Sequence, residues 1–382
     1  MNWKRIRPLY AGLIAVRKVL GRAYMRQASR SGTAQRKVFF SSFKGKAYSD
    51  SPRAVSEALQ ALRPDIDIVW QVRGSVRLPQ GVRAVRPHTL AALREIATAR
   101  CVVDNFNRPA YMRKSRGQLY VQTWHGDRGF KKMLYDLQPE GDFPDGAQMD
   151  LAVAGSDFGE KLYRSAFRYA GEVLKVGMPR NDALVNATPK ARLEARRRVG
   201  IASDAKILLY APTFREATVG GAQPMNLPAQ EALDALERAT GERWRMIVRA
   251  HDLNLGMCAL GAEVADLSDY PEMTDLLLSA DLLITDYSSC AGDFILTDRP
   301  VILYQPDFEK FIQQDRELYF DLQTCPYARA ETPHALLALL EQMDAVQTRN
   351  EAVRRFYGVC ETGRASQTVA EWISARIESE QS

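Results

Sequence analysis

The sequence predicts an α/β protein of two units, each a mostly parallel sheet covered by helices. Short apolar runs alternate with amphipathic segments along most of the 382 residues, a pattern typical of parallel sheets. The alternation stops near residue 178 and restarts after residue 200, which indicates a linker. With 46% hydrophobic and 26% charged residues, the chain can bury two ordinary cores, which excludes a disordered protein or a small disulfide scaffold.

The first unit is expected to contain seven strands. Its apolar runs are VFF (38–40), IVW (68–70), VRAV (82–85), CVV (101–103), LYVQT (119–123), LAVAG (151–155) and VLKV (173–176). Segments with helical spacing lie between them at 51–62, 89–99 and 156–170.

The second unit repeats this pattern with the runs ILLY (207–210), MIVR (246–249), LLIT (282–285) and VILY (301–304). Two helical stretches, 334–344 and 348–380, follow it. We therefore divide the chain into an N-terminal arm (1–35), a first α/β domain (36–185), a second α/β domain (186–350) and C-terminal helices that close the fold (351–382).

The positive charge is concentrated at the N-terminus. Twelve lysines and arginines precede Asp50, the first acidic residue, although the whole chain carries only +6. Because the excess is local, we do not expect a nucleic-acid partner. Projected on a helix, Lys4, Arg5, Arg7, Lys18, Arg22 and Arg26 lie opposite an apolar face, and only Arg17 breaks the separation. The apolar face is formed by Trp3, Ile6, Leu9, Tyr10, Leu13, Ile14, Val16 and Leu20.

Such a helix is expected to lie on an anionic membrane surface, so residues 1–30 predict peripheral attachment. The alternatives are a helix packed on its own domain with a solvated basic face, and a targeting peptide. No apolar run approaches the roughly 18 to 20 residues that span a bilayer, and no cleavage site follows residues 9–16. The five cysteines are widely spaced, as suits reduced thiols, so we expect a location at the cytoplasmic face of the membrane.

Two charged motifs are interpreted as ordinary surface features. Arg196-Arg197-Arg198 ends a helical pattern just before Gly200, so these arginines are expected to lie at a solvated helix end. Asp65-Ile66-Asp67 resembles a metal-nucleotide D-x-D pair, but it precedes a strand instead of ending one.

Two of the four histidines follow strands directly, one in each unit. Trp124-His125-Gly126 follows LYVQT, and Arg249-Ala250-His251 lies at the end of MIVR. Open α/β sheets bind ligands at the carboxyl ends of their strands, so His125 and His251 are expected to face each other across a cleft. Imidazole titrates near neutral pH, which makes both histidines candidates for proton transfer.

Further candidate ligand-binding residues lie at strand ends and in the linker. Thr285, Asp286, Ser288 and Ser289 lead from a strand into a helix, where hydroxyls and free N–H groups can bind phosphate or merely cap the helix. Arginine can grip a phosphate with two N–H donors, so no metal is required. The cationic and polar candidates are Arg180, Asn181, Thr213 and Arg215. No P-loop, G-x-G-x-x-G, C-x-x-C or H-E-x-x-H motif is present, so no cofactor is expected.

These segments in this order resemble the CDP-glycerol glycerophosphotransferase family, which includes the teichoic-acid glycerol- and ribitol-phosphate transferases and related capsule enzymes. The resemblance begins at Phe40-Ser41-Ser42-Phe43-Lys44-Gly45 and ends at Tyr319-Phe320-Asp321-Leu322. Between them lie the T-W-H-G, G-x-P-R-N-D, Y-A-P-T-F-R, R-x-H and I-T-D-Y-S-S segments. The chain departs from the family at Asp127, where a threonine is usual, and at Asp252, where a proline is usual.

The resemblance implies a GT-B fold of two Rossmann-like domains, with His125 and His251 as the active-site histidines. It implies attack by an acceptor hydroxyl on CDP-glycerol, with release of CMP and formation of a phosphodiester. The expected acceptor is a polyprenyl-linked glycan or growing polymer of a teichoic-acid-like or capsular material. The alternatives are a CDP-ribitol-dependent transferase, a GT-B glycosyltransferase using a nucleotide sugar, and a non-catalytic accessory subunit.

Overall fold

The seven apolar runs of the first unit form one parallel sheet in the order β3-β2-β1-β4-β5-β6-β7. The computed structural model describes residues 3–74, 76–109, 111–201, 204–213, 227–250, 263–314 and 317–378, and only the backbone of residues 3–15, 31, 314 and 378. The strands are β1 (Ala34–Ser41), β2 (Asp67–Gln71), β3 (Arg83–Val85), β4 (Ala99–Asp104), β5 (Leu119–Gln122), β6 (Leu151–Ala154) and β7 (Val173–Lys175).

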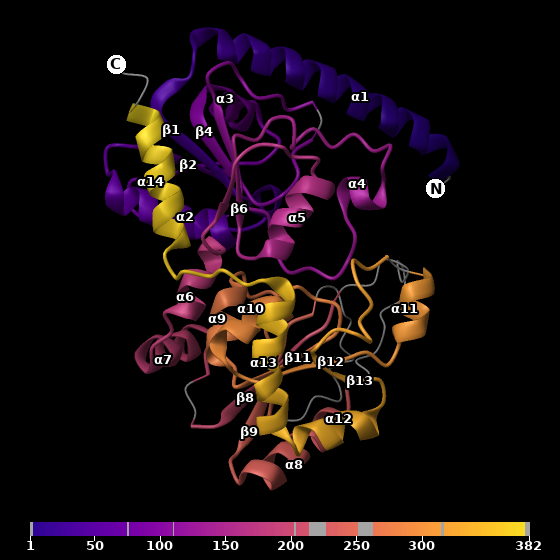
Figure 1. Ribbon diagram of the computed structural model, residues 1–382. Helices are drawn as coiled ribbons and strands as arrows, with labels where there is room; N and C mark the ends of the chain where they lie inside the picture. The colour runs from indigo at the N-terminus through magenta and orange to yellow at the C-terminus, as the bar shows by residue number, and fades with distance from the viewer. Residues whose placement is uncertain are drawn as a thin grey trace.

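Successive side chains of a strand point to opposite faces of the sheet, so they pack into the hydrophobic cores on its two sides. Val38 and Phe40 of β1 lie in one core and Phe39 lies in the other, and all three are almost fully buried. The covering helices are α1 (Trp3–Ala28), α2 (Asp50–Leu62), α3 (Leu90–Thr98), α4 (Leu134–Leu137) and α5 (Asp157–Ser165). We call this sheet, its helices and α14 (Ala365–Glu378) the N-terminal lobe (Figure 1).

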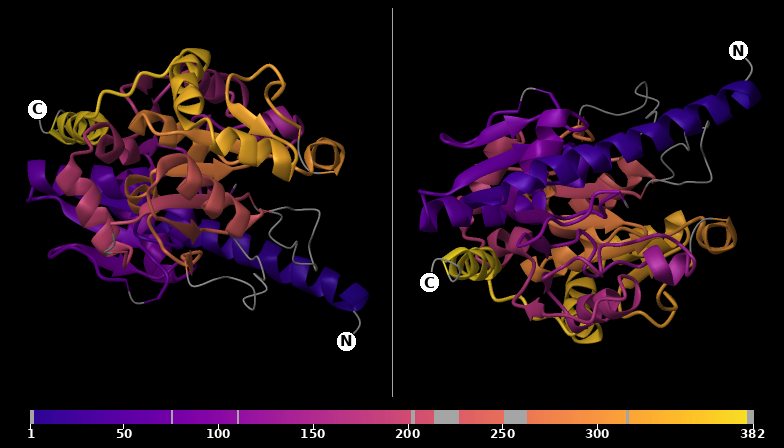
Figure 2. Two further views of the ribbon diagram at one scale, coloured as in Figure 1. Left: turned by 90° about the horizontal axis from the view of Figure 1, so that it is seen from below. Right: turned by 90° about the horizontal axis from the view of Figure 1, so that it is seen from above.

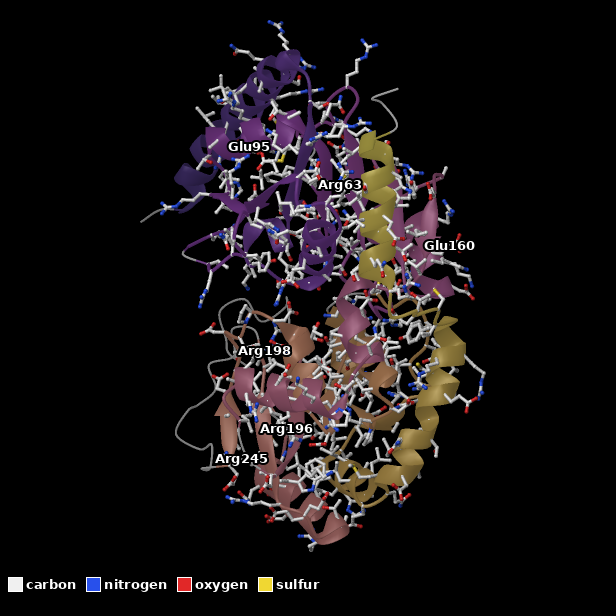
Figure 3. The ribbon with its side chains drawn as sticks, turned by 90° about the vertical axis from the view of Figure 1, so that its left-hand side faces the viewer. Arg63, Glu95, Glu160, Arg196, Arg198 and Arg245 are labelled. Carbon is white, nitrogen blue, oxygen red and sulfur yellow. The ribbon has the colours of Figure 1, made fainter. Side chains whose placement is uncertain are left out.

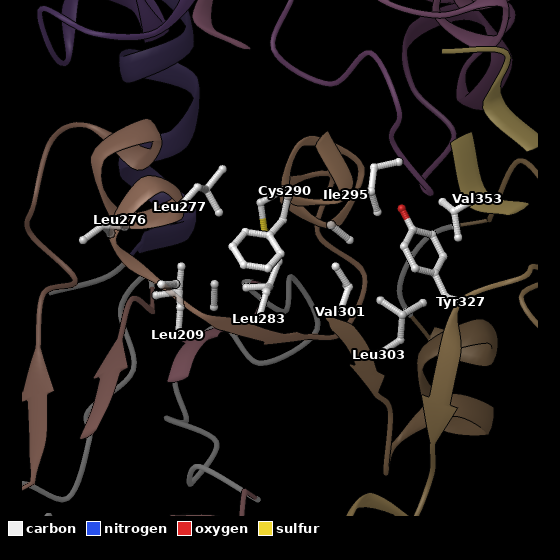
Figure 4. Close-up of a cluster of buried hydrophobic side chains, with 14 of the residues drawn as sticks. Leu209, Leu276, Leu277, Leu283, Cys290, Ile295, Val301, Leu303, Tyr327 and Val353 are labelled. Carbon is white, nitrogen blue, oxygen red and sulfur yellow. The ribbon is translucent and has the colours of Figure 1, made fainter. Parts of the chain in front are cut away.

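The C-terminal lobe is built on a second parallel sheet, in the order β10-β9-β8-β11-β12-β13. Its strands are β8 (Lys206–Ala211), β9 (Trp244–Val248), β10 (Val264–Asp266), β11 (Leu282–Thr285), β12 (Val301–Tyr304) and β13 (Ala328–Ala330). Its helices are α6 (Asp182–Val185), α7 (Pro189–Arg198), α8 (Ala229–Thr240), α9 (Met273–Ser279), α10 (Cys290–Phe294), α11 (Phe308–Gln314), α12 (Pro333–Leu340) and α13 (Met343–Tyr357). Figure 4 shows how Leu209, Leu283 and Leu303 of the sheet pack toward α9 and α10.

The chain passes between the lobes twice. It first crosses through a 3₁₀ turn at Pro179–Asn181, and it returns through residues 358–364, after which α14 packs on α2 of the N-terminal lobe. Val369, Ile373 and Ile377 of α14 are buried in the same core as β1. Figure 1 shows α14 beside α2, so the last helix belongs to the lobe in which the chain began. Figure 2 shows that the N-terminal end of α1 extends beyond both lobes.

The structure contains every strand expected from the sequence and two that were missed. The missed strands, β10 and β13, have three residues each at the two edges of the second sheet, so they lack a long apolar run. The expected final helix over 348–380 is wrong as a single element. Gly358 adopts a left-handed conformation (φ 62°) that ends α13, and α14 begins at Ala365.

The two charged motifs are engaged in ion pairs. Arg196 and Arg198 lie at the end of α7 (Figure 3). They pair with Asp281 and Asp275 of the same lobe, respectively. Asp65 pairs with Arg63 and Asp67 with Arg83, which accounts for both carboxylates of the D-x-D motif.

Helix α1 packs on its own lobe while leaving an apolar stripe in solvent. Met25 is buried in the core that includes α3, whereas Val16, Val19 and Leu20 are 56%, 68% and 63% exposed. These three residues have the spacing of one helix face, and that face points away from the core. No helix in the described part of the chain combines the length and apolar character needed to cross a bilayer.

Candidate active site

The first sheet has a topological switch point between β1 and β4, because the chain continues from these strands toward opposite edges of the sheet. Loops diverge at such a point and leave room for a ligand. Asn105, fully buried after β4, joins the two loops. Its Oδ1 accepts a hydrogen bond from the Phe43 N–H (2.8 Å), and its Nδ2 donates to Ser42 Oγ (3.2 Å).

His125 follows the adjacent strand β5 and is held by the backbone of Asn105. Its Nδ1 lies 2.7 Å from the Asn105 carbonyl oxygen. A carbonyl can only accept, so Nδ1 carries the proton and the neutral ring presents an unprotonated Nε2. Burial lowers the pKa of His125 below its ordinary value, although the Asn105 hydrogen bond and the Asp50 carboxylate favour the charged form. At neutral pH His125 is therefore a neutral proton acceptor.

Aromatic rings fix the plane of the imidazole. Phe106 stacks on His125 with centroids 5.1 Å apart and an interplanar angle of 4°, and Phe43 approaches edge-on at 5.3 Å. Trp124 lies 4.2 Å from the imidazole centroid and is itself buried against Phe167. Trp124 thus positions the histidine, and Gly126 continues the chain into a turn closed by its carbonyl and the N–H of Gly129.

The second sheet has its own switch point, between β8 and β11, and it is bridged in a similar way. Asp286 Oδ1 accepts the Thr213 N–H (2.8 Å), so a side chain after β11 holds the loop after β8. Thr285 is fully buried and donates its hydroxyl to the Ala211 carbonyl. Thr285 and Asp286 therefore fix the conformation of the loop after β8, and Thr213 belongs to that loop.

Ser288 and Ser289 lie at the start of α10, which has only five residues. Ser288 Oγ accepts a long hydrogen bond from the Cys290 N–H (3.4 Å), and Ser289 makes no side-chain cap. Both serines are half-buried, and their use by a ligand stays a prediction.

Arg180 and Asn181 are buried at the junction of the lobes. The Arg180 guanidinium donates to Asp293 of α10 (3.1 Å) and lies 3.6 Å from Asp50 at the start of α2. The Asn181 amide donates to both Asp293 and Glu361 (2.9 Å each). The structure places these two residues in an inter-lobe network. Arg180 Nη1 is the atom paired with Asp50, and it makes no hydrogen bond within the described part of the chain.

Arg128 is the centre of this network, and its side chain is 0% exposed. It donates to Asp293 (2.9 Å), to Glu361 (2.8 Å) and to the Gly155 carbonyl (3.1 Å). Burial raises the pKa of Glu361. Burial also tends to raise the pKa of Asp293, but Arg180 and Arg128 outweigh it and lower that pKa.

Asp127 also has a structural role. Its carboxylate accepts the Gly155 N–H (2.9 Å) and the Ser156 hydroxyl (2.8 Å) at the entry to α5. A Cβ on Gly159 would lie only 1.8 Å from Asp127 Oδ1, so the carboxylate fits tightly against that helix. The first departure from the family pattern is therefore accommodated by packing beside His125.

Arg249 extends the candidate site into the C-terminal lobe. Burial lowers the pKa of Arg249, and its Nε is buried with no hydrogen-bond partner among the residues that the structure describes. The Glu272 carboxylate is close enough to act on this charge, and it also accepts the Asp50 N–H (3.2 Å). Arg249 therefore lies on the junction that contains Asp50. His251, Arg215 and Asp252 lie outside the described residues.

Sequence reasoning missed Asn105, Asp50, Asp293 and Glu361. Asn105 lies two residues after the predicted strand at 101–103 and directly after β4, so its position near a strand end was a usable signal. Asp293 and Glu361 had no such signal in the sequence. They belong to a helix and to a connecting segment that contact Arg128 only in the folded chain.

The sequence matches the protein family described as CDP-Glycerol:Poly(glycerophosphate) glycerophosphotransferase over residues 23–375. Two teichoic acid poly(glycerol phosphate) polymerases are each 29% identical to this chain. The polymerase of Staphylococcus epidermidis aligns over 365 residues, which are 89% of this chain and 50% of that protein. The polymerase of Bacillus spizizenii aligns over 364 residues, 87% of this chain and 91% of that protein. The chain thus spans half the length of the first relative.

A solved structure is similar over the full length. The wall teichoic acid polymerase TagF, in a histidine-to-asparagine variant soaked with CDPG, matches with a TM-score of 0.84 and 26% identity. The match covers 100% of this chain and 98% of that chain. The family resemblance and the GT-B-like fold expected from the sequence are both confirmed.

Replacing Arg128 with methionine tests the inter-lobe network. The variant Arg128→Met should lose about 3–5 kcal/mol of unfolding free energy, because Asp293 and Glu361 would stay buried without their cation. Losing the cation raises their native pKa values, so the deficit should grow as pH rises. Denaturant titrations at several pH values measure both effects. The exposed Arg197→Met control should change stability by less than about 0.5 kcal/mol, and equal losses in the two variants would contradict the network's role.

Proposed function

This chain belongs to the CDP-glycerol:poly(glycerophosphate) glycerophosphotransferase family, and on that premise we propose that it transfers glycerol phosphate from CDP-glycerol to a hydroxyl of a polymeric or lipid-linked acceptor. The observation that carries the proposal is the hydrogen bond from His125 Nδ1 to the Asn105 carbonyl. That bond leaves Nε2 as a proton acceptor beside the switch point of the first sheet. The relatives, both poly(glycerol phosphate) polymerases, support glycerol over ribitol as the alditol.

His125 is the general base in this mechanism. The acceptor oxygen attacks the glycerol-bearing phosphorus, and its proton passes to His125 Nε2. The bond between that phosphorus and the oxygen of CMP breaks, and CMP leaves with the electron pair. The product is a phosphodiester, and the imidazolium later returns its proton to solvent. The lowered pKa of His125 suits this role, because the ring is neutral when the acceptor arrives.

Cationic groups at the junction would neutralise the phosphoryl oxygens. Arg249 Nε is a buried donor without a hydrogen-bond partner among the described residues, and Arg180 Nη1 has only the ion pair with Asp50 at 3.6 Å. Buried donors of this kind are costly unless a ligand completes them. Phosphoryl transfer depends mainly on positioning and charge stabilisation, which fixed guanidinium groups can supply without a metal ion. His251 and Arg215, which lie outside the described residues, remain proposed partners of this site through the family motifs, and Ser288 and Ser289 through their place after β11.

Helix α1 would hold the enzyme at the cytoplasmic face of the membrane, where a polyprenyl-linked acceptor is concentrated. Its exposed stripe of Val16, Val19 and Leu20 lies beside the basic residues Lys18 and Arg22. Apolar contact and attraction to anionic lipid together favour peripheral binding.

Release of CMP by the purified protein tests the reaction. With an oligo(glycerol phosphate) acceptor and excess EDTA, CDP-glycerol should yield CMP, whereas CDP-ribitol and UDP-sugars should yield little nucleotide. The variant His125→Asn should lower kcat by roughly 100-fold or more, because the proton loses its acceptor. The matched control His334→Asn changes an exposed histidine of the C-terminal lobe and should keep full activity. Full turnover by His125→Asn would contradict the base assignment, and release of UDP from a UDP-sugar would contradict the donor class.

Flotation with vesicles tests the membrane role of α1. The double variant Val19→Glu/Leu20→Glu should bind anionic vesicles roughly tenfold more weakly, because it places charges in the apolar stripe. Ile312→Glu, which alters a half-exposed apolar residue on α11, should bind like the unaltered protein. Equal flotation of all three proteins would show that α1 does not mediate attachment.

A further inference from the structure

Four basic side chains gather on the N-terminal lobe, and one of them, Lys44, lies near His125. Arg17 comes from α1, Lys44 from the loop after β1, Arg73 from the end of β2, and His88 from the segment before α3. All four are exposed, and the charges of Arg17, Arg73 and Lys44 all act on the His88 imidazole. The mechanism above uses none of them.

Tight backbone contacts bring these four residues together. The Arg73 N–H donates to the Gly45 carbonyl (2.8 Å), and Arg17 Nη2 donates to the His88 carbonyl (3.3 Å). Gly45 has φ +80° and approaches Pro87 so closely that a Cβ would lie 2.6 Å from the proline ring. The three loops are therefore locked against one another, and the positions of the cations are set by the fold.

One aromatic ring connects this cluster to the candidate base. The Lys44 ammonium lies 4.3 Å from the centroid of Phe106, and Phe106 stacks on His125. Lys44 thus lies one ring away from the imidazole, and Arg17 marks the other end of the cluster at α1.

Arg17, Lys44 and Arg73 have no carboxylate partners in the part of the chain that the structure describes. Burial and these three charges lower the pKa of His88, so at neutral pH its imidazole is a neutral hydrogen-bonding group. Other basic residues of the same lobe are paired, as Lys37 is with Glu95 and Arg83 with Asp67. Lys44 and His88 also have left-handed backbones (φ 58° and 64°), which are unfavourable for residues other than glycine. Strain of this kind is retained at ligand-binding sites when the surrounding structure enforces it.

We propose that Arg17, Lys44, Arg73 and His88 bind successive phosphodiesters of the acceptor, and this inference rests on the proposed function. In a glycerol-phosphate chain, the reacting hydroxyl and the preceding phosphate are separated by one three-carbon unit. When that hydroxyl reaches His125, the phosphate lies a short distance behind it, in the direction of Lys44. Arg73 and Arg17 then hold earlier phosphates along a path toward α1 and the membrane, and the His88 imidazole donates a hydrogen bond to them.

Steady-state kinetics of the double variant Lys44→Gln/Arg73→Gln test this site. The KM for a soluble oligo(glycerol phosphate) acceptor should rise at least about tenfold, because charge-assisted hydrogen bonds to phosphate are lost. The kcat and the KM for CDP-glycerol should change less than about twofold. The control Arg36→Gln removes an exposed arginine at the opposite end of β1 and should leave all three constants unchanged.

Binding of the same oligo(glycerol phosphate) without donor separates this inference from the proposed function. Titration calorimetry at low salt should show binding to the unaltered protein and to Arg36→Gln, and a loss of affinity in the double variant, even if no CMP is ever released. An unchanged acceptor KM and affinity in the double variant would overturn the proposal. If the double variant instead loses only binding to anionic vesicles, the cations contact lipid headgroups and the assignment to the acceptor is wrong.

Discussion

The buried ion network around Arg128 is the interaction on which the candidate site depends. Arg128 follows the loop that carries His125, and its partners Asp293 and Glu361 come from α10 and from the segment that returns to the N-terminal lobe. Arg180 and Asn181 of the first crossing join the same carboxylates. One set of charge-assisted hydrogen bonds therefore ties both crossings and both lobes together. Because buried ions without partners are costly, the network holds the lobes in one arrangement and fixes where Arg180 and Arg249 lie relative to His125.

In both lobes, a side chain that follows one central strand holds the loop that follows the neighbouring strand. The side chain of Asn105, after β4, accepts a hydrogen bond from the backbone of Phe43, after β1. The side chain of Asp286, after β11, accepts one from the backbone of Thr213, after β8. In the N-terminal lobe the backbone of the same residue, Asn105, also selects the tautomer of His125. A single residue thus couples the shape of the loop after β1 to the protonation state of the proposed base. The left-handed backbone of Trp124 (φ 47°) beside it indicates that the surrounding structure enforces this geometry.

The sequence pattern was sufficient to predict most strands, because the strands of a parallel sheet are buried on both faces and appear as continuous apolar runs. It failed at β10 and β13, whose three-residue edges carry no such run, and at Gly358, whose left-handed turn divides the last helical stretch. The strand-end position of His125 could be predicted, because a motif after an apolar run marks the ligand edge of a sheet. The residues that shift the pKa of His125 could not be predicted, because Asp50 and Asn105 approach it only in the folded protein. For the same reason Arg180 and Asn181, expected as substrate ligands, were not foreseen as members of the inter-lobe network.

The most direct test of this account is the protonation of His125, followed by ¹⁵N NMR of the histidine-labelled protein across about pH 4.5 to 8. The account predicts a neutral ring with its proton on Nδ1 and a pKa below the ordinary value of 6.5, because burial disfavours the imidazolium. Replacing Asp50 with asparagine should lower the pKa of His125 further, since a carboxylate that favours the charged form is removed. A neutral ring protonated on Nε2, or a pKa above 7, would contradict the assignment of His125 as the base.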